Sequence, residues 1–114
     1  MQETLSYQEE AILDMIGIGI DHPTKRRDIA EAMSMSDREV RRVITRLRKD
    51  YCICNMQDGR GYYIPAWDDK DSIERYIRQE QARAKSISRG LRGAYIALSE
   101  YYEWEGVNGV NGKK

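Results

Sequence analysis

The chain has 114 residues, of which 33% are charged and none is phenylalanine. This length suits one small domain with an appended segment, whose core must come from Ile, Leu, Val, Met and Tyr. The formal net charge is +0, so the chain as a whole has no excess positive charge to attract nucleic acid.

The charges are nevertheless unevenly distributed along the chain. Residues 1–24 contain five acidic residues and no Lys or Arg, whereas residues 25–60 contain ten Lys or Arg against six Asp or Glu. Residues 81–93 contain four basic residues and no acid. A local basic face, rather than the total charge, sets the potential that a phosphate backbone meets, so nucleic-acid binding stays open.

Other sequence features favour a cytoplasmic protein that is not an enzyme. The chain has no apolar run of about 18 residues and no basic-then-apolar leader, which predicts neither a membrane span nor a signal peptide. Cys52 and Cys54 are too close in sequence for an ordinary disulfide, which fits a reducing compartment. They also lack the further ligands of a zinc site, and His22 stands alone, so we expect no metal or cofactor. No Ser/His/Asp set or phosphate-binding glycine loop suggests catalysis.

Two short helices are expected first. Ser6 and Glu9 have the spacing of a capping box, and the apolar stripe that follows should end at Gly17. Thr24 is the expected N-cap of a second helix over residues 25–33.

A third helix is predicted over residues 36–51. Ser36 and Glu39 form a second capping-box pattern at its start. Apolar residues follow at the i, i+3, i+4, i+7 spacing of one buried helix side: Val40, Val43, Ile44 and Leu47. The opposite side is densely basic, which suits a helix that lies in a DNA groove while it stays attached to a domain.

A β-hairpin is predicted next. Residues 51–56 and 61–65 have the composition of short strands, and the turn between them is rich in Gly. Tyr62 and Tyr63 should point to opposite faces, one toward the core and one toward solvent.

The order helix, helix, turn, helix, hairpin leads to a resemblance. Residues 6–66 resemble the winged helix-turn-helix DNA-binding family, and in particular small winged-helix proteins encoded by phages of Gram-positive bacteria. The stretches that carry the likeness are SYQEEAILDMI, SDREVRRVITRLRKDY and GYYIPA. The chain departs from many such domains in having Arg60 as the only basic residue available in the wing.

The resemblance implies that the third helix enters the major groove. Arg38, Arg41 and Arg42 would then make bidentate contacts with guanine, while Arg46, Arg48 and Lys49 would lie nearer phosphates. The start of the second helix would cross the backbone, and the wing tip would approach the minor groove. The candidate DNA-binding residues are therefore Arg38, Arg41, Arg42, Thr45, Arg46, Lys49, Lys25, Arg26 and Arg60. The alternative is a solvated, salt-bridged helix face with Asp37 and Glu39 as partners.

Residues 67–105 contain no proline and predict a long helix. Its apolar residues step by alternating fours and threes, which is a heptad seam, with Glu80 as the one polar member. The seam consists of Ile73, Ile77, Ala84, Ile87, Leu91, Ala94, Leu98 and Tyr101, and the central residues predicted to form a dimer are Ile77, Ala84, Ile87, Leu91, Ala94 and Leu98. Gly90 or Gly93 leaves open whether the helix is continuous. The repeated Asn-Gly of residues 106–114 predicts a disordered tail.

The sequence thus predicts a mainly α protein with a small β-hairpin. A winged helix-turn-helix domain would span residues 1–66, and a long oligomerising helix would follow over residues 67–105. The predicted function is sequence-selective binding of double-stranded DNA by a homodimer, as a transcriptional regulator or as a replication or packaging accessory. One alternative is a winged-helix module that binds or inhibits a host protein. Another is a small terminase-like subunit, in which the long helices build a ring.

Overall fold

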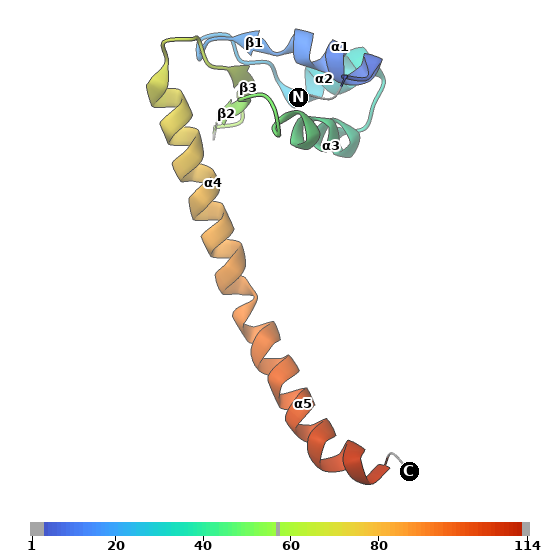
Figure 1. The fold of residues 1–114 in the computed structure, drawn as a ribbon. Helices are drawn as coiled ribbons and strands as arrows, with labels where there is room; N and C mark the ends of the chain where they lie inside the picture. Colours follow the sequence, from blue (N-terminus) through green and yellow to red (C-terminus); the bar gives the residue numbers. More distant parts are fainter. Residues whose placement is uncertain (1–3, 57, 113–114) are drawn as a thin grey trace. The chain divides into compact units, whose positions relative to one another are not determined.

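The computed structural model describes residues 4–56 and 58–112 and is mainly helical, with one small sheet (Figure 1). Two compact units form, Met1–Ile77 (unit 1) and Arg78–Lys114 (unit 2). The elements in chain order are α1 (Tyr7–Met15), β1 (Gly17–Ile18), α2 (Arg26–Met33), α3 (Asp37–Leu47), β2 (Cys54–Met56), β3 (Gly61–Ile64), α4 (Lys70–Gly90) and α5 (Arg92–Gly112). Among these elements, no helix is both long and apolar enough to cross a membrane.

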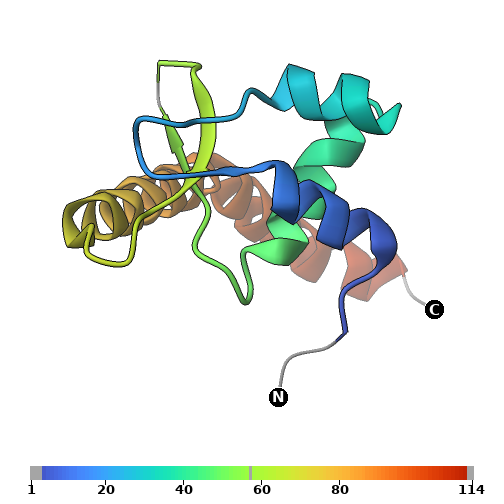
Figure 2. The ribbon, with the colours of Figure 1, turned by 90° about the horizontal axis from the view of Figure 1, so that it is seen from above.

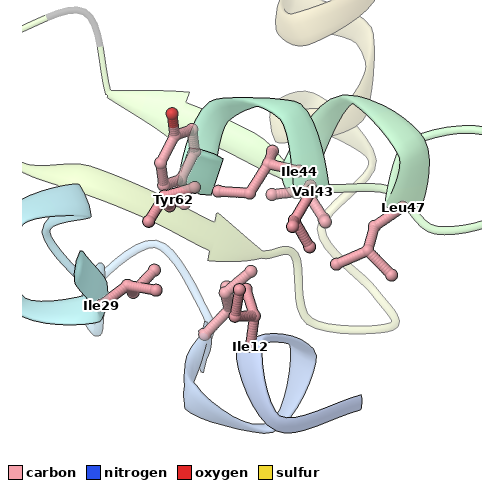
Figure 3. Close-up of a cluster of buried hydrophobic side chains, with 9 residues drawn as sticks. Ile12, Ile29, Val43, Ile44, Leu47 and Tyr62 are labelled. Atoms are coloured by element: carbon pink, nitrogen blue, oxygen red, sulfur yellow. The ribbon is translucent and has the colours of Figure 1, made fainter. Parts of the chain in front are cut away.

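Unit 1 is built on the apolar side of α3. Both predicted capping boxes are confirmed, since the side chains of Ser6 and Ser36 accept the backbone N–H of Glu9 and Glu39. Side chains of α1, α2, α3 and β3 converge on one core beneath α3, as Figure 3 shows, and the three helices enclose it (Figure 2). The buried residues of this core are Ile12, Ile16, Ile29, Val40, Val43, Ile44, Leu47, Ile53 and Tyr62.

The predicted hairpin is confirmed, but the sheet has a third strand that the sequence did not indicate. β2 pairs with β3 antiparallel, with Cys54 opposite Tyr63, and β1 pairs with β3 in parallel, with Gly17 opposite Tyr63. The sequence does not reveal β1, because a two-residue strand is too short to show an alternation of apolar and polar residues. Gly17 by itself indicates only the end of a helix. The strand order is β1-β3-β2, so the chain after α1 covers the free edge of the hairpin.

Thr24 does not cap α2, which corrects the expectation from its position. Its hydroxyl donates to the carbonyl of Met15 at 3.0 Å and accepts the N–H of Gly17 at 3.1 Å. Lys25 occupies the N-cap position of α2 and makes no side-chain capping bond. The Thr24 backbone also exchanges two 2.8 Å hydrogen bonds with Tyr62, so this residue joins the end of α1, β1 and β3.

The glycine at the start of β3 permits that contact. Gly61 has φ = +118°, and a Cβ there would lie 2.2 Å from the carbonyl oxygen of Thr24. Only glycine adopts this conformation readily and leaves room for the neighbouring backbone.

Both hairpin tyrosines are buried, so the expectation that one would be exposed is wrong. Tyr62 faces the helical core, whereas the ring of Tyr63 lies on the other face, 2% exposed. The hydroxyl of Tyr63 donates to Ser72 at 2.8 Å, and Asp69 accepts from both the hydroxyl and the backbone N–H of Ser72. The first turn of α4 therefore covers the face that sequence alternation assigned to solvent.

Unit 2 contains most of the long helical segment. The helix is interrupted at Leu91, where its N–H bonds the carbonyl of Ser88 at 3.1 Å, an i→i−3 contact. The flanking Gly90 and Gly93 weaken the helix locally, which accounts for the interruption.

Residues 106–112 are helical, which differs from the predicted disordered tail, and residues 113–114 of that prediction lie outside the described residues. α5 continues to Gly112, and the amide of Asn108 donates to the carbonyl of Trp104 at 2.9 Å. Glycine and asparagine lower helix propensity without forbidding the helix, whereas a proline would stop it.

The bonds of the Thr24 hydroxyl give a stability prediction. Thr24→Val keeps the side-chain shape and removes both hydrogen bonds, so we expect the free energy of unfolding to fall by about 1–3 kcal/mol in urea titrations. Thr45→Val is the matched control, because the exposed Thr45 hydroxyl bonds only to the carbonyl of Arg41 in its own helix. An equal loss in the two variants would contradict the joining role of Thr24.

Candidate nucleic-acid interface

The exposed side of α3 presents the basic residues that the sequence singled out. The buried side of the helix fixes its rotation, and all six candidates of this segment are exposed: Arg38, Arg41, Arg42, Thr45, Arg46 and Lys49. Lys49 lies in the turn after α3, because the helix ends at Leu47. The structure therefore places these residues on one accessible surface, but their charges are not equally free.

Several of the candidate arginines are held by acids of unit 1. Arg41 pairs with Asp37 at 3.1 Å, and Arg46 pairs with Glu9 of α1 at 3.1 Å. Asp37 also accepts from Arg26. Exposed pairs of this kind contribute little stability, but they lower the net positive charge at these positions and orient the side chains.

Arg26 joins α2, α3 and the sheet. Besides its bond to Asp37, it donates to the hydroxyl of Tyr62 at 3.2 Å. The Tyr62 and then the Asp37 hydrogen bonds raise the pKa of Arg26 above its usual value. This half-buried guanidinium stabilises the domain, and its predicted phosphate contact would have to compete with two internal partners.

Arg48 is a structural residue, contrary to the expectation that it faces phosphates. Its guanidinium donates to the carbonyl of Ile53 at 2.9 Å and to the side chain of Asn55 at 3.2 Å. It also lies 5.7 Å from the ring centroid of Tyr62 and 4.8 Å from that of Tyr76. No local pattern in the sequence indicates this role, because the aromatic partners come from β3 and α4.

The basic residue of the β2–β3 turn is also paired. Arg60 donates to Asp58 at 2.7 Å, and the backbone N–H of Arg60 bonds the same carboxylate. These bonds, the backbone one foremost, lower the pKa of Asp58. The turn therefore presents a compensated charge rather than a free cation.

Seven basic residues of unit 1 form no ion pair within the residues that the structure describes. Two of these are not surface candidates of the α2–α3 region, because Arg48 is hydrogen-bonded to Ile53 and Asn55 and Arg75 belongs to α4. We call the other five the unpaired cations: Lys25, Arg27, Arg38, Arg42 and Lys49. All five are exposed. Arg42 lies near Glu39, whose pKa is lowered mainly by the backbone N–H of Ser36 and to a smaller extent by the charge of Arg42. The geometry thus separates Arg38 and Arg42 from the paired Arg41 and Arg46.

The two cysteines of unit 1 differ in exposure, since Cys52 is exposed and Cys54 is buried. Their sulfur atoms lie 3.9 Å apart, and both are free thiols. Burial, and then the nearby Cys52, raises the pKa of the Cys54 thiol to about 12. Within residues 4–56 and 58–112, no group of three or more His, Cys, Asp or Glu side chains is placed to hold a metal ion.

The seam residues of the long helical segment are exposed in the single chain. The larger ones are about half accessible: Ile77 48%, Ile87 62%, Leu91 45% and Leu98 47%. Ala84 and Ala94 are exposed as well. Ile77 is the last residue of unit 1, and the other five belong to unit 2.

Comparisons with known proteins add no relative. No family model matches the chain, and searches of curated proteins and of solved structures returned no match.

The contacts of Arg48 distinguish it from its neighbours in a folding assay. Arg48→Ala should lower the free energy of unfolding by about 1–3 kcal/mol, because a charged hydrogen-bond donor and its aromatic contacts are lost. The exposed, unpaired Arg42→Ala should change it by less than about 0.5 kcal/mol. Urea titrations of the two variants test this difference, and a smaller loss for Arg48→Ala than for Arg42→Ala would contradict the assignment.

The cysteines should differ sharply in alkylation. A thiol with a pKa of about 12 has almost no thiolate at neutral pH, so iodoacetamide should modify Cys52 and leave Cys54 unmodified in the folded protein. Peptide mass spectrometry locates the modification, and labelling in urea shows that both thiols react once unfolded. Rapid modification of Cys54 in the native protein would contradict its burial.

Proposed function

We propose that unit 1 is a winged helix-turn-helix domain that binds double-stranded DNA through α3. The order of its elements supports this proposal: α2 and α3 are joined by a short turn, and the β2–β3 hairpin follows α3 as a wing would. The third strand, β1, completes a small sheet beside the helices. In such a domain, α3 is the recognition helix and lies in the major groove.

The observation that carries the proposal is the pair of unpaired arginines on the exposed side of α3. Arg38 and Arg42 lie one helical turn apart, near the N-terminal end of a helix whose opposite side is fully buried. A guanidinium without an internal partner is available for bidentate contact with guanine. Arg41 and Arg46, by contrast, are oriented by Asp37 and Glu9 and are secondary candidates.

The remaining unpaired cations suit contacts with the DNA backbone. Lys25 and Arg27 lie at the start of α2, the helix that crosses the backbone in this arrangement, and Lys49 follows the C-terminal end of α3. These cations would raise the affinity for DNA and orient the domain on it, without contributing to sequence specificity. Arg60 is a weaker candidate for the minor groove because Asp58 compensates it.

The exposed heptad seam supports a protein that acts as a homodimer. Two copies would cover the half-exposed seam residues and bring two recognition helices to one DNA molecule, which raises specificity beyond that of a single domain. Such a dimer fits a transcriptional regulator or an accessory in phage replication or packaging.

The test begins with selection of bound duplexes from a random DNA pool, followed by anisotropy titrations with the selected site. Arg42→Ala should weaken binding about 5- to 150-fold, which corresponds to 1–3 kcal/mol for a lost bidentate base contact. Arg42→Lys keeps the charge but not the bidentate geometry, so its affinity for the selected site should be little higher than that of Arg42→Ala. Arg89→Ala, the same change of charge in unit 2, is the control and should leave affinity nearly unchanged.

The salt dependence of the same titrations separates DNA binding from the rival function. The logarithm of the affinity should fall linearly with the logarithm of the salt concentration, with a slope of about −0.9 for each phosphate contacted. Removing Lys25 should reduce that slope by about one phosphate. Absence of measurable affinity for any duplex at low salt would overturn the proposal and favour a module that binds a protein.

A further inference from the structure

The two halves of unit 2 carry opposite charge. Residues 78–92 contain five basic residues, Arg78, Arg83, Lys85, Arg89 and Arg92, against the single acid Glu80. Residues 93–112 contain three acids, Glu100, Glu103 and Glu105, and no Lys or Arg. Two copies aligned in the same direction would place like charges along each other over the whole length, whereas copies aligned in opposite directions would place the basic half beside the acidic half.

The sizes of the seam residues point the same way. In a parallel pair each seam residue meets its own copy, so Ala84 would face Ala84 and Tyr101 would face Tyr101. This leaves the two alanine layers underfilled and the Tyr101 layer overfilled. In an antiparallel pair the a position of one helix meets the d position of the other. One antiparallel register places a small residue opposite a large one at both alanines of the seam, Ala84 and Ala94.

We infer that unit 2 binds a second copy of this chain in the antiparallel direction, in the register that centres the pair between Arg92 and Gly93. Its layers pair Leu91 with the partner's Ala94, Ile87 with the partner's Leu98, and Ala84 with the partner's Tyr101. This inference rests on the dimer proposed above and adds its direction and register.

The ends of the seam differ between the two directions. The antiparallel register places Glu80 opposite the partner's Glu105, a like-charge pair whose repulsion is reduced by Arg83, which lies 3.3 Å from Glu80 in its own chain. A parallel pair would place Glu105 beside its own copy, in a segment without any Lys or Arg.

The direction determines a distance that can be measured. In the antiparallel register Arg78 lies opposite residue 107 of the partner, so the two Arg78 positions are separated by about 43 Å at 1.5 Å per residue. In a parallel pair the same positions would be roughly one to two helix diameters apart, about 20 Å or less. Residue 92 lies at the centre and gives a short distance in both arrangements.

The experiment is spin-label distance measurement on the full chain. Cys52→Ser removes the exposed thiol, and the buried Cys54 stays unlabelled in the native protein. Labels at Arg78→Cys should give a distance distribution centred near 43 Å. Labels at Arg92→Cys are the matched control and should give a short distance, which shows that the pair has formed.

A charge exchange tests the register independently. Arg83→Glu should weaken dimerisation about 10-fold in sedimentation experiments, because it adds a third carboxylate beside Glu80 and the partner's Glu105 twice in the symmetric pair, whereas Glu105→Arg alone replaces a like-charge contact and should not weaken it. The double variant should return to within about 3-fold of the native chain. Arg89→Glu changes the charge equally but lies away from the seam, so it should have a much smaller effect, and circular dichroism checks that helix content is unchanged.

The outcomes separate the claims. A short distance at residue 78 would overturn the antiparallel direction and leave the dimer intact. A monomer at all accessible concentrations, or a ring of many copies, would overturn the dimer together with its direction. DNA affinity is measured in a separate titration. If the DNA-binding proposal is wrong, the protein will bind no duplex, while its spin-label distances will still be those of an antiparallel dimer.

Discussion

Tyr62 is the residue on which unit 1 depends most. Its ring belongs to the buried core, its hydroxyl accepts from Arg26, and its ring face contacts the Arg48 guanidinium. Its backbone exchanges two hydrogen bonds with Thr24, while β2 and β1 pair on either side of its strand. One side chain and one stretch of backbone thus connect all three helices to the sheet. The rotation of α3, and hence the direction of its basic side, is set by its own buried apolar residues, which pack in the same core as Tyr62.

The same junction decides which cations remain available. The guanidinium groups of Arg26 and Arg48 bond to partners inside unit 1 and join the helices to the sheet. Arg41 is paired with Asp37, and Arg46 is paired with Glu9. Arg38 and Arg42 share the same helix, yet no described acid forms an ion pair with either. A basic helix is therefore not a uniform binding surface, and the distribution of internal acids separates structural arginines from those free to meet a ligand.

Sequence reasoning succeeds where the signal is local. The two capping boxes and the apolar spacing of α3 are set by neighbouring residues, and the hairpin is set by its turn, so these elements could be predicted. The contacts of Thr24, Tyr63 and Arg48 could not be predicted, because their partners belong to other elements: Met15, Ser72 and Tyr76. The candidate surface was found from the sequence, whereas the division between paired and unpaired arginines needed the acids of other elements in space.

The pattern of unit 2 bears on how paired recognition helices would reach DNA. A compact palindrome presents its half-sites about 34 Å apart, and parallel helices would bring the two domains close together at one end. The opposite charges of the two halves of unit 2 instead favour an antiparallel pair of helices. In that pair the two Arg78 positions lie at opposite ends, about 43 Å apart. The pair itself then does not force its domains onto adjacent turns of one duplex.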